Sequence, residues 1–451
     1  MLNRLTALCA VGALACSGCG GGQGSADASP PDQVARVRSL EDSSEAALLA
    51  DASDSSSLVD ATGGNGSVGG SGGAVCPGSD TKVPRNPGSP RWIQSFGSLE
   101  ITSVAFAPAG EVLLAQSGAQ TSKLTSDGSL IWSRPFGALV ATTADGRIYI
   151  AGTFIDSVTL GAEQLQSRGG RDVYVAELDA DGVVLSAVAL GGSEDDDVQS
   201  LVVDVAHGLV VSGQGLGMVK LDASGEVLWQ KPFFGELSLD SQGNVIATGA
   251  LLGSQDYGAG RLDSRGGSDV FVVKLSPRGE TLFSLGFGDA GTLQRGEGVA
   301  VDRHDNVIVT GTFDGSLEFG AGVLSVKPGA CSADAWCLTS GFVVKLDPSG
   351  HALWSMSRGP MRALPGVATD GYGNVFVSGA LPGGVRPFRQ VWLGAFDAEA
   401  LQLWQQTAWP ETGVGAGHDI AVNDCAELVW SVSARPSFEA EEQPYVAKLS
   451  L

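Results

Sequence analysis

The densest cluster of ionisable side chains in the sequence is the run Glu194-Asp195-Asp196-Asp197. Hard cations such as Ca²⁺ prefer several oxygen ligands on one loop, so Asp195, Asp196 and Asp197 are candidate calcium ligands. The alternative is a solvated turn, in which the carboxylates only keep the loop in water. We favour the turn, so no metal is predicted, and calcium binding remains the competing hypothesis.

Histidine and glycine motifs offer no catalytic site. The four histidines His207, His304, His351 and His418 are expected in or beside turns, with no second ligand at metal-binding spacing. Neither Gly-x-Ser-x-Gly nor His-Glu-x-x-His occurs. The segment Gly213-Gln-Gly-Leu-Gly217 opens no helix, so it is expected to be a turn rather than a phosphate-binding loop. We predict no catalytic residue and no cofactor; an enzyme would need ionisable groups brought together from distant segments.

Two cysteines are close enough in sequence to form a local disulfide. Cys331 and Cys337 are six residues apart, and a disulfide between them would close a small ring worth about 2 kcal/mol in the loop-entropy model. A metal-thiolate pair is the alternative, but it lacks nearby histidine or cysteine partners.

The N-terminus has the pattern of a signal peptide. A short basic start, Met1-Leu-Asn-Arg4, precedes an apolar stretch from Leu5 to Ala15 and then Cys16-Ser-Gly-Cys19. About 11 apolar residues are too few to span a bilayer, which takes about 20. Small residues before a cysteine resemble a bacterial lipoprotein lipobox.

That resemblance implies that a lipid is attached to the cysteine after cleavage, which anchors the protein to a membrane. Cys16 is the preferred lipidation site, and Cys19 is the alternative, because cleavage there leaves an even number of cysteines. Residues 1–19 are thus a lipoprotein signal peptide and anchor region. We expect the protein in the bacterial cell envelope, anchored to the outer membrane on its periplasmic or surface face.

Composition separates a linker from a folded region. Residues 20–90 are rich in Gly, Ser, Ala, Asp and Pro, with too few large apolar residues to offset the entropy of ordering, so a disordered linker is predicted. The formal net charge of −23 opposes binding to a phosphate backbone, so no nucleic-acid partner is expected.

Three phrases recur in order along residues 91–451, and each occurs seven times. The first begins a strand at Trp92, Trp132, Ser186, Trp229, Phe283, Trp354 and Trp404, the second is a turn followed by a β-branched run that ends in Gly, and the third is a strand that enters another tight turn. The repeated Asp-x-x-Gly places Asp where its side chain bonds the backbone and Gly where a positive φ is convenient. Examples of the second and third phrases are Asp302-Arg-His-Asp-Asn-Val-Ile-Val-Thr-Gly311 and Asp269-Val-Phe-Val-Val-Lys-Leu-Ser-Pro-Arg-Gly279.

The spacing of these phrases predicts an all-β protein, a seven-bladed β-propeller of four-stranded blades. The region begins in the first phrase and ends, at Tyr445 to Leu451, in the third. The N-terminal strand at Arg91 to Gly97 is therefore expected to complete the last blade. In such a ring Cys76 and Cys425 would be neighbours, so a second disulfide between them is predicted.

The repeats resemble the bacterial SBBP-type β-propeller repeat. The residues that carry the resemblance are Gly191-Gly-Ser-Glu-Asp-Asp-Asp197 with Leu201-Val-Val-Asp204, and Gly266-Gly-Ser-Asp-Val-Phe-Val-Val-Lys-Leu275. A weaker similarity, at Lys220-Leu-Asp-Ala-Ser-Gly-Glu-Val-Leu-Trp229, is to the outer-membrane assembly lipoprotein with PQQ-type repeats. With the leader, the first resemblance implies a propeller lipoprotein of the envelope, a group without one shared activity.

These observations predict a non-catalytic binding or scaffolding propeller. Its partner would be an envelope protein or a glycan, the lipid would hold it at a membrane surface, and the protein is expected to be a monomer. The alternative is a propeller enzyme, PQQ- or lactonase-like, with an active site in the central channel.

Overall fold

The computed structural model describes one short segment and most of the region after residue 90. The chain divides into two compact units, Met1–Val34 and Ala35–Leu451, and the described residues lie in the second. They are 36–39, 90–97, 99–117, 120–291, 293–326, 339–361, 363–382, 389–408, 414–423, 427–435 and 443–451. The predicted lipidation sites and both predicted disulfides lie outside them (Cys16, Cys19, Cys76, Cys331, Cys337 and Cys425).

Seven four-stranded antiparallel sheets follow one another along the chain, and we number them as blades 1 to 7. Blade 1 contains β3 (Ile101–Phe106), β4 (Val112–Gln116), β5 (Gln120–Leu124) and β6 (Leu130–Arg134). Blade 2 contains β7 (Leu139–Thr142), β8 (Ile148–Leu160), β9 (Glu163–Leu178) and β10 (Val184–Leu190). Blade 3 contains β11 (Ser200–Val203), β12 (Leu209–Gly213), β13 (Gly217–Leu221) and β14 (Val227–Lys231).

Two of the remaining blades carry an extra hairpin. Blade 4 contains β15 (Glu236–Leu239), β16 (Val245–Leu251), β19 (Asp269–Leu275) and β20 (Thr281–Phe287), with the hairpin β17 (Ser254–Asp256) and β18 (Arg261–Asp263). Blade 5 contains β21 (Gln294–Val301), β22 (Val307–Phe313), β25 (Ser340–Leu346) and β26 (Ala352–Pro360), with the hairpin β23 (Ser316–Glu318) and β24 (Val323–Ser325). Blade 6 contains β27 (Ala363–Thr369), β28 (Val375–Pro382), β29 (Arg389–Phe396) and β30 (Gln402–Ala408).

The last blade is built from both ends of the folded region. Blade 7 contains β31 (Val414–Asn423), β32 (Glu427–Arg435), β33 (Gln443–Ser450) and β2 (Trp92–Ser95). Strand β2 pairs antiparallel with β33, in a register that places Trp92 opposite Lys448. The prediction that the N-terminal strand completes the last blade is therefore confirmed.

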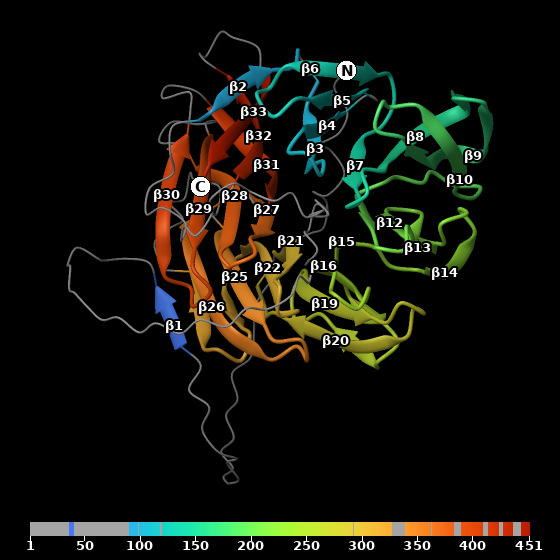
Figure 1. Cartoon of the computed structure of the whole chain (residues 1–451). Coiled ribbons are helices and arrows are strands. Elements are labelled where there is room, and N and C mark those ends of the chain that lie inside the picture. Colours follow the sequence, from blue (N-terminus) through green and yellow to red (C-terminus); the bar gives the residue numbers. More distant parts are fainter. Residues whose placement is uncertain are drawn as a thin grey trace, which may run out of the picture. The chain divides into compact units, whose positions relative to one another are not determined.

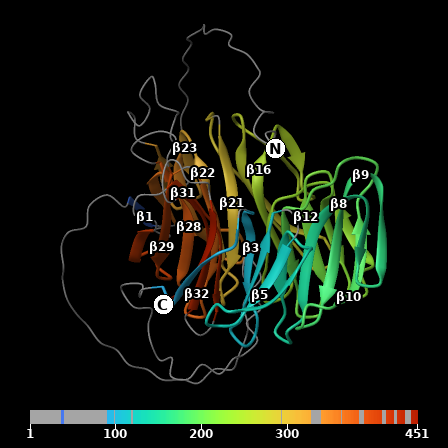
Figure 2. The same ribbon diagram turned by 90° about the horizontal axis from the view of Figure 1, so that it is seen from above.

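The first strand of every blade lies innermost, and each innermost strand contacts that of the next blade, so the seven blades close into a ring. Figure 1 shows the blades arranged around the ring, and Figure 2 shows them from the perpendicular direction. The predicted all-β, seven-bladed β-propeller is thus confirmed. No helix in the described part of the chain is long and apolar enough to cross a membrane.

The core lies between neighbouring sheets, as the recurring apolar runs predict. Every residue of β12, β19 and β22 is buried, because both faces of these middle strands pack against adjacent blades. The Asp turns also form as expected: the Asp222 carboxylate accepts hydrogen bonds from the backbone N–H groups of Ser224 and Glu226, and Gly225 has a φ of +85°.

One four-residue strand precedes the propeller. Within the region expected to be a linker, β1 (Arg36–Ser39) pairs in parallel with β26, the outer strand of blade 5. The outer edge of a blade in this protein can therefore take a fifth strand.

Adjacent blades are joined by a repeated set of contacts that we call the interblade clasp. A Trp on the outer strand of one blade donates its indole N–H to the second residue of the turn between the third and fourth strands of the next blade. The donor and acceptor pairs are Trp92 and Ser126, Trp132 and Ala180, Trp229 and Pro277, and Trp354 and Ala398, at 2.9–3.1 Å.

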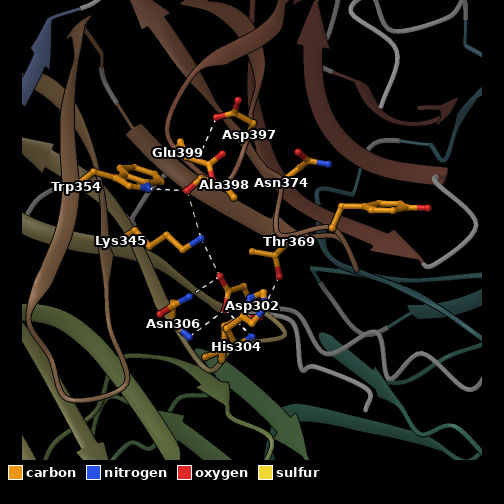
Figure 3. Close-up of polar contacts among 12 residues, drawn as sticks. Asp302, His304, Asn306, Lys345, Trp354, Thr369, Asn374, Asp397, Ala398 and Glu399 are labelled. Atoms are coloured by element: carbon orange, nitrogen blue, oxygen red, sulfur yellow. Dashed lines mark hydrogen bonds and ion pairs between the residues drawn. The ribbon is translucent and has the colours of Figure 1, made fainter. Parts of the chain in front are cut away.

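A buried lysine on the third strand completes most clasps. Figure 3 shows Lys345 between the Asp302 carboxylate and the backbone carbonyl of Ala398, which also accepts from Trp354. The Lys345–Asp302 ion pair measures 2.8 Å. Equivalent lysines pair with an acidic residue at the turn between the first two strands of their own blade (Lys123 with Glu111, Lys220 with Asp204, Lys274 with Asp240 and Lys448 with Glu427).

Blades 2, 4 and 6 depart from the clasp. Four blades pair the clasp Trp with Lys, and in blade 4 the lysine, Lys274, is paired with Phe283 instead of Trp. In blade 2 both members change, and Glu177 is paired with Ser186. In blade 6 Ala395 is paired with Trp404, so the Asp370 turn carboxylate has no lysine beside it. Among the described residues the buried Trp404 indole N–H has no acceptor, because the chain ends occupy the place of the turn in blade 7.

Candidate binding cavity and central channel

A cavity of about 870 Å³ lies between blades 2 and 3. The volume falls in the range typical of small-ligand sites, about 300–1,000 Å³. One wall comes from β10 and the loop after it, the other from β13, β14 and their connecting turn, and the extended β8–β9 hairpin closes one end. Apolar lining residues are Leu165, Val188, Leu190, Leu216, Val219 and Val227, and polar ones are Gln164, Gln166, Arg168, Ser193, Glu194, Asp196 and Gln230.

The acidic loop after β10 forms one end of this cavity. Asp196 is buried, and its carboxylate accepts the backbone N–H of Gly192 at 2.7 Å. Asp195 accepts the backbone N–H of Arg171 at 2.9 Å, and the Arg171 guanidinium lies 3.2 Å from the Asp197 carboxylate. The contacts with Arg171 bind the loop to the middle of β9, the third strand of blade 2.

The three candidate calcium ligands therefore use oxygens on protein partners. Among the residues that the structure describes, no three His, Cys, Asp or Glu side chains are grouped as metal ligands. The loop belongs to the connection between blades 2 and 3, as the turn interpretation expects. Calcium binding by Asp195, Asp196 and Asp197 stays a hypothesis.

A second polar site lies at the centre of the ring, where carboxylates from three blades face one another. Glu236 begins the innermost strand of blade 4 and accepts a hydrogen bond of 2.8 Å from the Gln199 amide of blade 3. Burial, together with the negative charges of Asp419 and Glu297, raises the pKa of Glu236 to about 7, although the Gln199 hydrogen bond opposes the change. Glu236 can thus carry or release a proton near neutral pH.

The two neighbouring carboxylates sit on β-bulges of innermost strands. The register of β21 shifts between Gly296 and Gly298, and that of β31 shifts between Gly417 and Ile420, which turns Glu297 and Asp419 out of the regular alternation. Glu297 accepts the backbone N–H of Leu364 in blade 6 at 2.6 Å, and Asp419 accepts that of Val104 in blade 1 at 2.8 Å. Both therefore also join adjacent blades.

The histidines are not brought together. His207, His304 and His351 lie in turns, as expected. His207 has a φ of +62° and a hydrogen bond of 2.9 Å to the Tyr149 hydroxyl across the boundary of blades 2 and 3. The expectation for His418 was wrong: it lies within β31, on the bulge beside Asp419, where it contacts Glu100 and Ser433. Because the β-bulge interrupts the regular strand at His418, its side chain has polar neighbours like those of a turn residue.

The ring of seven four-stranded sheets makes this protein a β-propeller. No family model matches the sequence, and no curated protein matches it. Its structure is similar to Raptor of Chaetomium thermophilum, at 10% identity and a TM-score of 0.49, over 81% of this chain and 29% of Raptor.

Two further solved structures are similar. The Pan2 WD40 domain of Neurospora crassa matches at 11% identity and a TM-score of 0.45, over 80% of this chain and 95% of that domain. BamB of Moraxella catarrhalis matches at 11% identity and a TM-score of 0.36, over 78% of this chain and 85% of that one. The assignment of the fold rests on the sheet topology described above.

Proposed function

We propose that this protein is a non-catalytic binding or scaffolding propeller, and that the cavity between blades 2 and 3 is its contact site. The leader supports the further proposal that a lipid on Cys16, or on Cys19, tethers it to the outer membrane of a bacterial envelope. The expected partner is an envelope protein or a glycan, bound by a monomer.

The lining of the cavity carries this proposal. It combines apolar side chains with amides, backbone groups and few charges, which is the chemistry of a recognition site. Ser193 is the one hydroxyl residue among the described lining residues, and no His, Lys or Cys lines the cavity with it to act as a base. Asp196 and Arg168 also bond backbone groups of the same loop, at Gly192 and Gly191.

A pull-down tests the proposal. Tagged full-length protein is captured from detergent-solubilised membranes, with a Cys16→Ala, Cys19→Ala double variant as the control for the anchor. We expect a specific envelope partner that is enriched with the wild-type protein and lost or reduced with the unanchored variant. Enrichment of the same proteins by both and by an unrelated propeller would count against the proposal.

A second candidate function is an enzyme with its site in the central channel. The observation that favours it is Glu236, a carboxyl group with a pKa of about 7 that faces two other carboxylates. A pKa near the working pH suits a general acid or base. An activity found in the purified protein that Glu236→Gln abolishes, without a change in melting temperature, would favour this candidate over the binding protein.

A further inference from the structure

The cavity between blades 2 and 3 lies where neighbouring grooves hold an aromatic side chain. In four grooves the clasp indole lies against the turn of the next blade; a Cβ added to Gly182, for example, would lie 2.9 Å from the Trp132 ring. Phe283 takes the equivalent place in blade 4, near Gly350. In blade 2 the equivalent residue is Ser186, fixed by its pairing with Glu177.

Small side chains continue along the wall of this groove. Alternate residues of an outer strand point to the same side, and in blade 2 the next such residue is Val188, which lines the cavity. The corresponding pairs in the other blades are larger (Trp132 and Arg134, Trp229 and Lys231, Phe283 and Leu285, Trp354 and Met356, Trp404 and Gln406, Trp92 and Gln94). The cavity, which Val188 and Gly225 line, therefore extends from the place where these side chains lie in the other blades.

Compared with the other clasps, this groove lacks an aromatic ring and an indole N–H donor. Gly225 lines the cavity, and the Val188 side chain lies against it where an indole ring lies in the other clasps. The backbone carbonyl of Ala223 stands at the position that accepts an indole N–H in the other clasps. The Glu177 carboxylate, which pairs with Arg147, has no proton to donate in its place. A Trp ring supplied from outside would lie beside Val188 and bring the indole N–H that this groove lacks.

The edge of blade 2 can hold the polypeptide that presents such a ring. Strand β10 is an outer strand, so within the described part of the chain one row of its backbone groups has no neighbouring strand. The pairing of β1 with β26 shows that an outer edge of this propeller accepts a fifth strand. A strand added to β10 would direct alternate side chains over the cavity. The exposed carboxylates of Glu194 and Asp195 favour a basic segment.

We therefore infer that the groove between blades 2 and 3 binds an extended, basic segment of a partner protein that adds to β10 and inserts a Trp side chain into the cavity. The inference rests on the proposed binding function and names the class of partner. It also explains why one blade lacks both the Trp and the Lys of the clasp.

Peptide binding to the full-length protein tests the inference, with a labelled peptide, acetyl-Lys-Thr-Val-Trp-Val-Thr-Lys-amide, followed by fluorescence anisotropy. We expect saturable binding, and at least tenfold weaker binding when Ala replaces the Trp of the peptide. Ser186→Trp should fill the groove, raise the melting temperature and weaken binding at least tenfold. Phe283→Trp in blade 4, where the groove already holds a ring, is the matched control and should leave binding unchanged.

Other outcomes would overturn the inference. They are equal binding of the Trp and Ala peptides, undiminished binding by a folded Ser186→Trp variant, and N-acetyl-tryptophan amide binding as tightly as the peptide, which would indicate a site for free aromatic compounds. If Ser186→Trp does not fold, protection of the β10 amides from hydrogen exchange by the Trp peptide decides the question in the wild-type protein. A membrane partner that Ser186→Trp still captures would leave the binding function intact and place its site elsewhere.

Discussion

At the residue scale, similar buried carboxylates are stabilised to different degrees. Burial alone would raise the pKa of Asp302, but hydrogen bonds from Lys345 and Asn306 and the ammonium charge outweigh it, so the pKa lies below its usual value. Asp370 occupies the same turn position in blade 6 beside Ala395. There burial prevails over hydrogen bonds from Asn374 and the backbone, and the pKa is raised.

Two matched substitutions follow from this difference. Asp302→Asn should lower the free energy of unfolding by about 3 kcal/mol, because it leaves the Lys345 ammonium buried without its counter-charge. Asp370→Asn should cost about 1 kcal/mol or less, since the carboxylate it removes has no lysine partner. Urea unfolding of both variants measures the difference, and equal costs would contradict the role assigned to the lysine.

The raised pKa of Glu236 leads us to expect that the stability of the fold depends on pH. Its pKa rises from 4.5 to about 7 on folding, so between these values the folded protein binds a proton that the unfolded chain releases. The free energy of unfolding should therefore be greatest below about pH 4.5 for this group and fall as pH rises through 7. Glu236 is only partly buried, so solvent screens its charge and we expect a change of about 1–2 kcal/mol.

The measurement compares the wild type with Glu236→Gln by chemical unfolding at several pH values. The neutral amide keeps the shape and cannot ionise, so the slope between about pH 5 and pH 7.5 should flatten in the variant. Identical slopes in the two proteins would show that Glu236 does not titrate in this range.

At the scale of the element, β2 is the strand on which ring closure depends. It pairs only with β33 within blade 7, and Trp92 joins that blade to blade 1 through Ser126. Deletion of Arg91 to Gly97 should therefore open the ring and lower the melting temperature by about 10 °C or more. Deletion of Arg36 to Ser39 is the control, because β1 adds to an outer edge without closing anything. An unchanged melting temperature after the first deletion would contradict the role of β2.

The elements also mark how far the sequence could predict this protein. The outer, second and third strands follow from the three phrases, because Asp-x-x-Gly turns and apolar runs are local signals. The cavity could not be predicted from the sequence. Ser186 is the one small residue among the aromatic strand starts, but only its pairing with Glu177 in the structure shows that blade 2 lacks the clasp. The central carboxylates Glu236, Glu297 and Asp419 were also missed, since they come from separate blades, and the glycines flanking Glu297 were their main local signal.

At the scale of the whole molecule, the ring combines repetition with departures in blades 2, 4 and 6, of which that in blade 4 is only Phe283 in place of Trp. Seven similar blades would close into a ring through similar clasps, and the buried ion pairs and indole hydrogen bonds repeat from blade to blade. Blade 2 lacks the clasp and borders a cavity. Blade 6 lacks the clasp lysine, and the pKa of its turn residue Asp370 is raised. The departures from the repeat are therefore the places where function is best sought.

The position of the chain ends in blade 7 has a mechanical consequence. The chain that precedes Arg91 enters the ring through β2, so a pull on that chain, once β1 has separated from β26, loads the pairing of β2 with β33 and the contact of Trp92 with blade 1. The other six blades are each a continuous stretch of chain. Among the four strands that make up each blade, tension from the N-terminal side would therefore reach β2 of blade 7 first.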